Sequence, residues 1–234
     1  MADKTTNVRA DELNYDKYTS EVYDNDIKRS IPGYDELHKA IDKTVHELSK
    51  KHEVKKILEL GIGTGLTSEK ILKIIPTASL TAFDFSEQMM NGAKKRLSNY
   101  DVKYVLGDYS ELKFDTGFDM VLSVIGIHHQ NDDGKKKLFR RISKSLKSGG
   151  IFIFGDLVTY CDKKKAAVND AQHYHHLVEN ARNEQALEEW TYHHRFLNLL
   201  SPIEDQVKWL KESGFSIVEV KYEYLNTALI VAIK

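Results

Sequence analysis

The chain has 234 residues, 41% of them hydrophobic, and its 34 basic and 35 acidic side chains leave a formal net charge of −1. A dedicated nucleic-acid-binding protein usually carries a basic surplus, so direct binding of nucleic acid is not expected. The chain has no run of about 18 apolar residues that would cross a membrane, no apolar signal core near its start, and a single cysteine, Cys161, which excludes an internal disulfide. These features predict a single large domain in the reducing cytoplasm.

The first predicted elements are helices. Residues 15–50 show helical spacing of apolar side chains, and Pro32 and Gly33 interrupt the pattern. From residue 55 onward, segments with strand character alternate with amphipathic ones. We predict strands at about 55–60, 79–85, 102–108, 118–127 and 151–157, and helices at about 67–75, 86–97 and 135–146. This alternation indicates a parallel sheet covered by helices on both faces.

Polar residues and glycines indicate how these helices begin and end. Thr67 or Ser68 is expected to cap the first of them and Ser86 the second. Gly149–Gly150 is expected to end the third. The basic run Lys135–Lys137 within that helix is expected to lie on a solvated face rather than to contact RNA.

The alternation stops between residues 160 and 200. This segment is polar, helical in character and rich in histidine and aromatic residues, so we predict an inserted cap. The alternation resumes with a helix after Ser201–Pro202 and with two final strands. Only Leu225 and Asn226 separate these strands, which predicts that they pair antiparallel through a tight turn.

The most informative motif is the stretch KKILELGIGTG, where a predicted strand runs directly into Gly61, Gly63 and Gly65. A helix follows at once, so bare backbone N–H groups face a ligand at the turn. Leu66 occupies the position at which the dinucleotide-binding fingerprint has its third glycine, so NAD is not expected. Glu59 places a carboxylate beside the turn, and this favours a cationic ligand.

Acidic side chains follow the next strands, at the sheet edge where open parallel sheets bind their ligands. Asp84 lies 23 residues after Gly61, where a carboxylate can accept hydrogen bonds from both hydroxyls of a ribose. Asp108 ends the third strand and can accept from an adenine amino group. Ser123 and Asp156 end the two strands that follow. The ordered set predicts a nucleotide-like ligand at this edge.

These positions resemble the consecutive motifs of class I S-adenosylmethionine-dependent methyltransferases. The resemblance covers residues 55–157 and rests on KILELGIGTG, TAFDFSEQMM, LGDYSEL, FDMVLSVIGIHH and LKSGGIFIFGD. It implies methyl transfer as the activity and S-adenosyl-L-methionine as the cofactor, with Glu59 and Ser123 at its methionine end, Asp84 at the ribose and Phe85 beside the adenine. The full implied set of cofactor-binding residues in this region is Glu59, Gly61, Gly63, Gly65, Asp84, Phe85, Asp108, Tyr109 and Ser123.

A narrower resemblance lies before the core and at the closing hairpin. The segment VYDNDIKRSIPGYDEL is similar to the carboxy-S-adenosylmethionine synthase family, which makes a carboxylated cofactor for transfer-RNA uridine modification from prephenate. It implies that Tyr34 touches the cofactor. That family has an asparagine where this chain has Ser123, and Arg195 is the nearest counterpart of its functional arginine.

Together the alternation and the resemblance predict an α/β fold with a Rossmann-like, doubly wound, mostly parallel seven-stranded sheet and an antiparallel last strand. N-terminal helices and an inserted helical cap complete it. The expected divisions of the single methyltransferase domain, residues 1–234, are an N-terminal helical lid (1–50), a cofactor-binding core (51–159), a cap insertion (160–200) and a closing helix with a hairpin (201–234).

The catalytic residues are less well defined by the sequence. His128, His129 and Arg195 are the candidates, and the cap adds His173, His175, His176, His193 and His194. The clustered imidazoles of the cap make a metal site conceivable. No metal is expected, because no cysteine or carboxylate spacing supports a metal site. The expected acceptor of the methyl group is an unidentified small molecule. The alternatives are a carboxy-S-adenosylmethionine synthase-like enzyme and a non-catalytic S-adenosylmethionine-binding protein, and a homodimer stays open.

Overall fold

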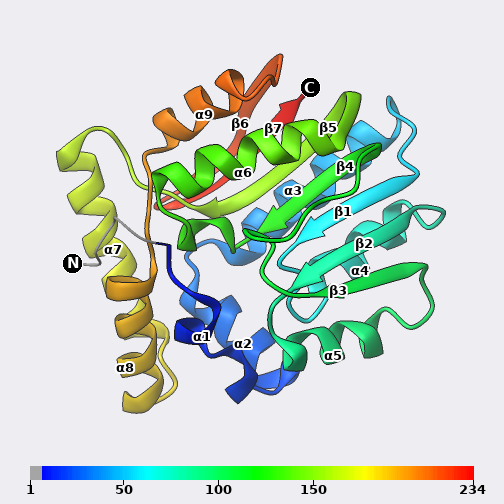
Figure 1. Ribbon diagram of the computed structural model, residues 1–234. Coiled ribbons are helices and arrows are strands. Elements are labelled where there is room, and N and C mark those ends of the chain that lie inside the picture. Colours follow the sequence, from blue (N-terminus) through cyan, green and yellow to red (C-terminus); the bar gives the residue numbers. More distant parts are fainter. Residues whose placement is uncertain (1–6) are drawn as a thin grey trace.

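The computed structural model describes residues 7–234, and over this range the chain forms one seven-stranded sheet (Figure 1). Its strands are β1 (Lys56–Leu60), β2 (Ser79–Asp84), β3 (Val102–Leu106), β4 (Phe118–Val124), β5 (Leu146–Leu157), β6 (Ile217–Tyr224) and β7 (Thr227–Ile233). They are ordered β3-β2-β1-β4-β5-β7-β6 in the sheet. The pairs among β1 to β5 are parallel, and β7 runs antiparallel to both β5 and β6. The predicted mostly parallel sheet with an antiparallel last strand is confirmed.

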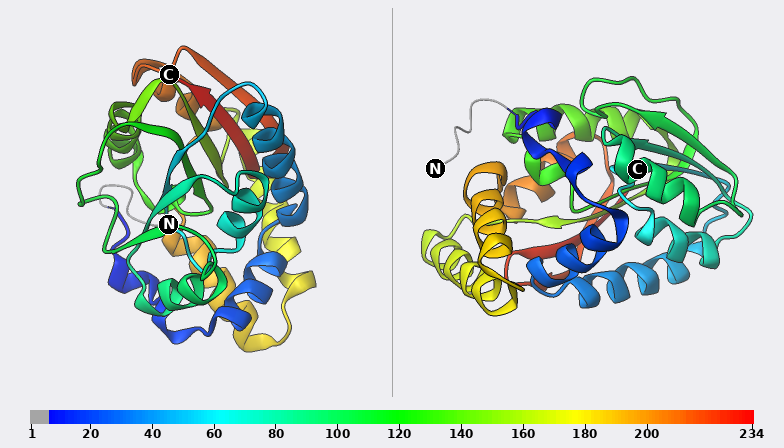
Figure 2. Two further views of the ribbon diagram at one scale, coloured as in Figure 1. Left: turned by 90° about the vertical axis from the view of Figure 1, so that its right-hand side faces the viewer. Right: turned by 90° about the horizontal axis from the view of Figure 1, so that it is seen from below.

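Helices cover both faces of the sheet (Figures 1 and 2). They are α1 (Ala10–Leu13), α2 (Ser20–Ser30), α3 (Tyr34–Ser49), α4 (Leu66–Ile74), α5 (Glu87–Arg96), α6 (Asp132–Ser145), α7 (Lys163–Asn180), α8 (Glu184–Tyr192) and α9 (Ile203–Glu212). Shorter helical turns are η1 (Tyr15–Lys17), η2 (Ile127–His129) and the π-helical η3 (His193–Leu197). Helices α3, α4 and α5 pack on one face of the sheet, and α6 and α9 pack on the other.

Successive side chains of the central strands point to opposite faces and are buried on both. Ile57 packs among α3, α4 and α5, whereas its neighbour Leu58 packs on the side of α6 and α9. In β5, every residue from Gly150 to Leu157 is buried. This two-sided burial explains why the strands read as continuous apolar runs in the sequence.

Helix α4 begins differently from the prediction. Gly65 is its N-cap residue, with a left-handed φ of 78°, so neither Thr67 nor Ser68 caps the helix. Ser68 lies in the first turn instead, where its hydroxyl donates a hydrogen bond to the carboxylate of Glu59. A side chain at position 65 would come within 3.3 Å of the Cα and Cβ of Ala93 in α5. The glycine therefore lets α4 and α5 approach closely as well as turning the chain.

Helix α6 ends earlier than predicted. It ends at Ser145, and Gly149–Gly150 lie inside β5 rather than at a helix end. The physical reason is that Leu146 is already extended and pairs with Phe118 at the start of β4. The chain thus passes directly from helix to strand, without a glycine cap.

The basic run in α6 does not lie wholly on a solvated face, and the prediction was wrong for Lys135. This side chain is fully buried, and its Nζ donates hydrogen bonds to the carbonyl of Leu199 at 2.5 Å and the hydroxyl of Ser201 at 2.7 Å. Lys135 precedes the core residues Leu138 and Phe139 by three and four positions, which places it on their side of the helix. It ties α6 to the segment that leaves the cap.

The N-terminal helices and the cap lie at the edge of the sheet where the parallel strands end (Figure 1). Viewed from below, α2 runs beside α7, and the two helices are in contact (Figure 2). Two segments far apart in sequence thus cover the same end of the sheet, the end at which the glycine turn and the acidic residues were predicted to form a site.

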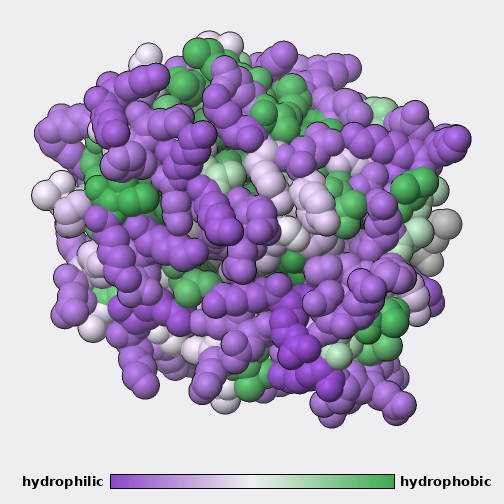
Figure 3. All heavy atoms as spheres, turned by 180° about the vertical axis from the view of Figure 1, so that it is seen from behind, coloured by the Kyte–Doolittle hydropathy of each residue, from purple (hydrophilic) through white to green (hydrophobic). Residues whose placement is uncertain are grey.

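No helix within residues 7–234 is long and apolar enough to cross a membrane. The face opposite to that of Figure 1 is largely hydrophilic (Figure 3). Hydrophobic residues on that face form separate small groups rather than one continuous surface.

Candidate functional site

The glycine turn after β1 borders a cavity of about 940 Å³, including its solvent-open part, which we call the first cavity. Gly61 and Gly63 line it, with φ angles of 77° and 54° that side-chain-bearing residues rarely adopt. A Cβ on Gly61 would point toward the Tyr109 ring, 3.7 Å away, and would take up cavity space. Gly65 lies outside the lining. The first two glycines therefore keep the backbone open to a ligand.

Two buried carboxyl groups lie beside the turn. Asp84, at the end of β2, accepts hydrogen bonds from the backbone N–H of Gly63 at 2.7 Å and of Ser86 at 2.9 Å, and burial raises its pKa to about 6. Glu59, in β1, accepts a hydrogen bond from Ser68, and burial raises its pKa to about 8. A cation in the first cavity would favour the ionised form of both groups.

The residues after β2 and β3 form the far end of the first cavity. Asp108 lines it and accepts a hydrogen bond of 2.7 Å from the amide two residues ahead. Tyr109 is buried, and its hydroxyl donates to the carbonyl of Gly126 at 3.0 Å. Phe85 stacks on Tyr15, with 5.7 Å between ring centroids. An acceptor and aromatic rings thus enclose the region predicted to hold an adenine.

Ser123 does not line the first cavity. It is fully buried, and its hydroxyl donates to the carbonyl of Leu60 at 2.9 Å, which joins β4 to β1. The cavity wall is formed instead by Val124 and Ile125. Ile125 has a left-handed φ of 53°, which is rare for a β-branched residue. Such backbone strain is concentrated at functional sites, where the surrounding structure holds it in place.

The N-terminal segment contributes aromatic walls to the first cavity. Tyr34 lines it, is 6% exposed, and packs on His38 with 4.3 Å between ring centroids. Tyr15 and Tyr23 also line it, and their rings meet edge to face with 5.7 Å between ring centroids. The sequence analysis singled out Tyr34 alone. The close spacing of tyrosines in YDKYTSEVY was the signal that could have identified the others.

An ion pair connects these N-terminal walls to the glycine turn. Arg96 in α5 contacts Asp24 in α2, with 2.6 Å between Nη2 and Oδ2. The same guanidinium donates to the carbonyl and to the hydroxyl of Thr64, both at 2.8 Å. The Thr64 hydroxyl in turn donates to Asp24 at 2.5 Å. Helix α2 is therefore fastened to the loop that shapes the first cavity.

A second cavity of about 690 Å³ adjoins the first. The two cavities share four wall residues, Tyr15, Tyr23, Ile27 and Ile125. The cap supplies much of the remaining wall, including Trp190, Leu177 and several histidines. Sequence analysis predicted the cap but not this cavity, because it forms only where α2, α7 and α8 come together.

Charged walls of the second cavity are acidic. The described residues that line it include no lysine or arginine, but they include two carboxylates, Asp26 and Glu189. Asp26 pairs with Arg182 at 2.8 Å. Glu189 pairs with Lys17 at 3.3 Å and accepts a hydrogen bond of 2.8 Å from Tyr18. The cavity therefore presents aromatic, imidazole and carboxylate groups to a ligand.

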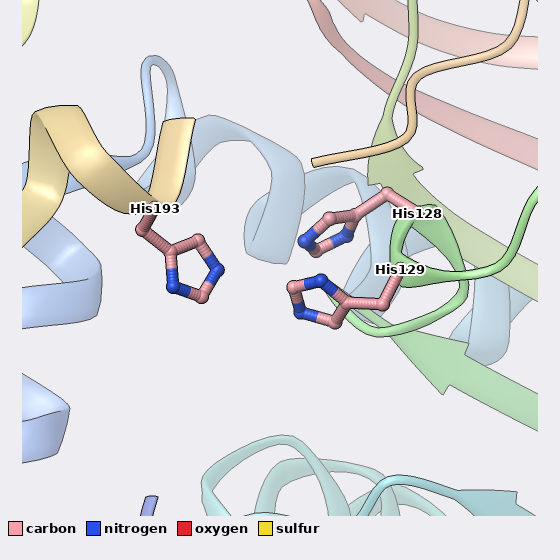
Figure 4. Close-up of side chains that lie close together, drawn as sticks. All are labelled: His128, His129 and His193. Atoms are coloured by element: carbon pink, nitrogen blue, oxygen red, sulfur yellow. The ribbon is translucent and has the colours of Figure 1, made fainter. Parts of the chain in front are cut away.

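Three histidines meet where the two cavities adjoin (Figure 4). His128 and His129 lie in η2, directly after β4, and His193 comes from the cap at the start of η3. Ring centroids are 4.0 Å apart for His128 and His129, and 5.1 Å apart for His129 and His193. The structure thus brings two catalytic candidates together with a cap residue.

Hydrogen bonds fix the orientation of two of these rings. Nδ1 of His128 lies 2.5 Å from Oδ1 of Asp156, and Nδ1 of His129 donates to the carbonyl of Leu197 at 2.8 Å. Burial, together with neighbouring histidines, lowers the pKa of His129 well below its usual value and that of His193 to about 3. Both rings are therefore neutral near pH 7, and each has an unprotonated nitrogen.

The third catalytic candidate, Arg195, lies apart from these histidines. Its side chain is exposed and borders a surface hollow with Asp170 and Tyr174, and this hollow shares His194 and Asn198 with the second cavity. Other cap histidines hold the cap in place, since Nε2 of His173 and of His176 lie 3.2 and 2.9 Å from backbone carbonyls at the end of α2. The structure therefore groups His128 and His129 with the two cavities but not Arg195.

Comparisons with known proteins agree with this geometry. A family model described as a methyltransferase domain matches residues 57–150. The chain is 29% identical to carboxy-S-adenosyl-L-methionine synthase of Campylobacter fetus subsp. fetus (strain 82-40), over 95% of each chain. Among solved structures, it resembles the plantazolicin methyltransferase BpumL in complex with a triazolic desmethylPZN analog and SAH (TM-score 0.69, 16% identity, 95% of this chain and 92% of that one). It also resembles human N-acetylserotonin methyltransferase in complex with SAM (TM-score 0.57, 16% identity, 87% and 52%).

The first cavity fits S-adenosyl-L-methionine by the chemistry of its donors and acceptors. Glu59 suits the cationic end, Asp84 the ribose hydroxyls, and Asp108 the adenine amino group, and open glycine backbone lies between them. The fold, the matched domain and the order of these residues along the chain agree with one another. The matched domain, the relatives and the fold together support a class I S-adenosylmethionine-dependent methyltransferase.

Proposed function

We propose that this enzyme methylates a small molecule that is neutral or cationic, and that the acceptor binds in the second cavity. The observation that supports this most directly is the shared wall of Tyr15, Tyr23, Ile27 and Ile125, which places the second cavity next to the first. Trp190 and the tyrosines offer flat, partly polar surfaces to a planar ligand. The basic partners of Asp26 and Glu189, which are Arg182 and Lys17, lie outside the lining, so the acceptor would meet carboxylates rather than cations, and this disfavours an anionic acceptor.

The bound cofactor would supply a methyl carbon that its sulfonium group already makes electrophilic. The protein's part is to align the acceptor with that carbon and to exclude water. Within the predicted lid, residues 1–50, the segment from Tyr15 to Tyr34 would close over the cavities, because its side chains line both of them, and residues 160–200 would serve as the cap. His128, His129 and His193 would face the reactive atom of the acceptor.

The test is a panel of small hydroxylated and amine-bearing aromatic compounds, incubated with enzyme and cofactor and analysed by mass spectrometry. We expect a methylated product from neutral or cationic members and none from anionic ones. Trp190→Ala should raise KM for the acceptor and leave the Kd for S-adenosyl-L-methionine unchanged, because Trp190 lines only the second cavity. A methylated product from anionic compounds alone would contradict the proposal.

A second candidate function is carboxy-S-adenosylmethionine synthesis, which the similarity over 95% of both chains favours. Such an enzyme needs a cation to hold a carboxylate near the cofactor. Neither cavity has a lysine or arginine among its described lining residues, and Arg195 borders a neighbouring hollow that shares His194 and Asn198 with the second cavity. Incubation with cofactor and prephenate separates the two functions, because only the synthase activity yields a carboxylated cofactor.

We further infer that the enzyme works in the cytoplasm and does not bind nucleic acid directly. The net charge of −1 and the exposed thiol of Cys161 support this inference. A gel-shift assay with transfer RNA should show no complex, and size-exclusion chromatography with light scattering would decide between a monomer and a homodimer.

A further inference from the structure

We propose that His128, His129 and His193 bind a divalent first-row metal ion. Zn²⁺ is the ion with which we would test this binding. The site would lie at the boundary between the two cavities. The role that we assign to the ion, holding the methyl acceptor, rests on the proposed function, whereas the binding of the ion does not.

The first observation is the convergence of the three rings (Figure 4). One ring nitrogen from each histidine lies within 4.8 Å of the corresponding nitrogens of the other two. Zinc–nitrogen bonds of about 2.0–2.1 Å would draw three such atoms to roughly 3.3 Å from one another. His193 can make this adjustment, because it begins a π-helical turn in the cap, whereas η2 directly follows a central strand.

The second observation is the support behind two of the rings. The Asp156 carboxylate holds Nδ1 of His128, and it also accepts a hydrogen bond of 2.9 Å from the backbone N–H of the same residue. The carbonyl of Leu197 holds Nδ1 of His129. Metal-binding histidines typically donate the second ring N–H to a carboxylate or a backbone carbonyl, which leaves Nε2 for the metal. Both forms of this support are present here.

The third observation concerns the ligand count. Three protein nitrogens leave at least one position of a tetrahedral ion free, as in catalytic rather than structural zinc sites. The hydroxyl of Tyr15 lies 3.2 Å from Nε2 of His129 and so reaches the same space. His128 and His193 also line the second cavity, so the free position would face a bound acceptor.

An acceptor hydroxyl bound to the ion would lose its proton to water more readily, because a metal cation stabilises the alkoxide or phenolate that remains. The oxygen would be held at the cavity boundary, close to the region in which the methyl group lies. The three histidines would serve as ligands, and none of them would need to act as the base.

The experiment uses tag-free protein that has been treated with a chelator and dialysed. Zn²⁺ binding is measured by calorimetry and by metal analysis, and Co²⁺ is used as a visible spectroscopic probe. We expect about one equivalent of tightly bound Zn²⁺ per chain. With Co²⁺ we expect the intense visible absorption bands of a tetrahedral ion with nitrogen ligands. His193→Gln should weaken Zn²⁺ binding by at least about tenfold and abolish these bands.

His175→Gln is the matched control, because His175 is an exposed cap histidine outside the cluster and its removal should change nothing. Equal Zn²⁺ affinity of wild type and His193→Gln, or no Co²⁺ bands in the wild type, would overturn the proposal. If the variant does not fold, the absence of Co²⁺ bands in the wild type still overturns the proposal. Metal binding without any methylated product would count against the proposed function alone, and methyl transfer by protein that binds no metal would count against this inference alone.

Discussion

The carboxylate of Asp84 accepts a hydrogen bond of 2.7 Å from the backbone N–H of Gly63, so the end of β2 holds the glycine turn that follows β1. A single acid thereby shapes the loop and faces the cavity that the loop borders. Its removal should affect cofactor binding in two ways, through loss of the contact that we propose with the ribose and through a looser turn.

Asp84→Ala is therefore expected to weaken binding of S-adenosyl-L-methionine by about 1.5–3 kcal/mol, since hydrogen bonds to a charged acceptor are lost. Isothermal titration calorimetry gives the two dissociation constants. Asp101→Ala is the control, because this exposed acid precedes β3 and lies outside the cavity. An unchanged affinity in Asp84→Ala would remove this residue from the cofactor site.

The stability of the ligand-free protein should depend on pH through Glu59. Burial raises the pKa of this carboxyl from an ordinary value of 4.5 to about 8, so between these values the folded state keeps a proton that the unfolded chain releases. The contribution of Glu59 to stability is thus fully present below about pH 4.5 and is lost as the pH rises toward about 8. Melting temperatures of wild type and Glu59→Gln across this window measure the effect, and the variant should show the flatter profile.

Cofactor binding should show the opposite dependence on pH. A cation in the first cavity favours ionised Glu59, so affinity should rise as the pH approaches 8 in the wild type, and less so in Glu59→Gln. Parallel affinity profiles for the two proteins would mean that the cationic end of the cofactor binds elsewhere.

Tyr34→Phe should separate the role of the hydroxyl from that of the ring. The ring is buried against Ile31 and Leu157, so Tyr34→Ala would also open a core cavity and cost about 3 kcal/mol of stability. Tyr34→Phe should leave the melting temperature nearly unchanged and weaken cofactor binding severalfold if the hydroxyl meets the ligand. Tyr104→Phe, which removes a hydroxyl outside the cavity, is the control. Equal affinity of all three proteins would confine Tyr34 to a packing role.

Lys135→Met should destabilise the fold by about 1–3 kcal/mol, because it leaves the buried carbonyl of Leu199 without this donor. Lys137→Met, at an exposed position of the same helix, should stay within about 0.5 kcal/mol of the wild type. Urea denaturation provides both values. If Lys135→Met lowers the free energy of unfolding no more than Lys137→Met does, the hydrogen bonds of Lys135 would contribute no net stability.

The sheet could be predicted from the sequence, and most of the residues predicted to bind the cofactor line the first cavity, because both depend on local patterns. Continuous apolar runs identified buried strands, and the Ser86 hydroxyl caps α5 as its position before the helix indicated. Ser123 shows the limit of this approach. Its place at the end of β4 was correct, but whether a side chain points into a cavity or bonds a neighbouring strand depends on packing that no local pattern encodes.

The second cavity and the histidine cluster could not be predicted for a related reason. Their walls come from the N-terminal helices, from η2 and from the cap, which lie more than a hundred residues apart in places. In the sequence, His193 is one of several cap histidines. Only the folded chain shows that His193 lies in the cluster whereas His175 is exposed. Lys135 is a similar case. Its position in the helical period of α6 is on the buried side, but its charge led to the prediction that it is exposed to solvent.

Helix α2 carries a consequence for the order of events in a catalytic cycle. Its residues Tyr23 and Ile27 belong to the walls of both cavities, so one displacement of this helix would unseal both at once. The enzyme would then have a single gate in place of two. Spent cofactor and methylated product would leave in the same opening event, and the interval between openings, rather than the transfer itself, would set the pace of turnover.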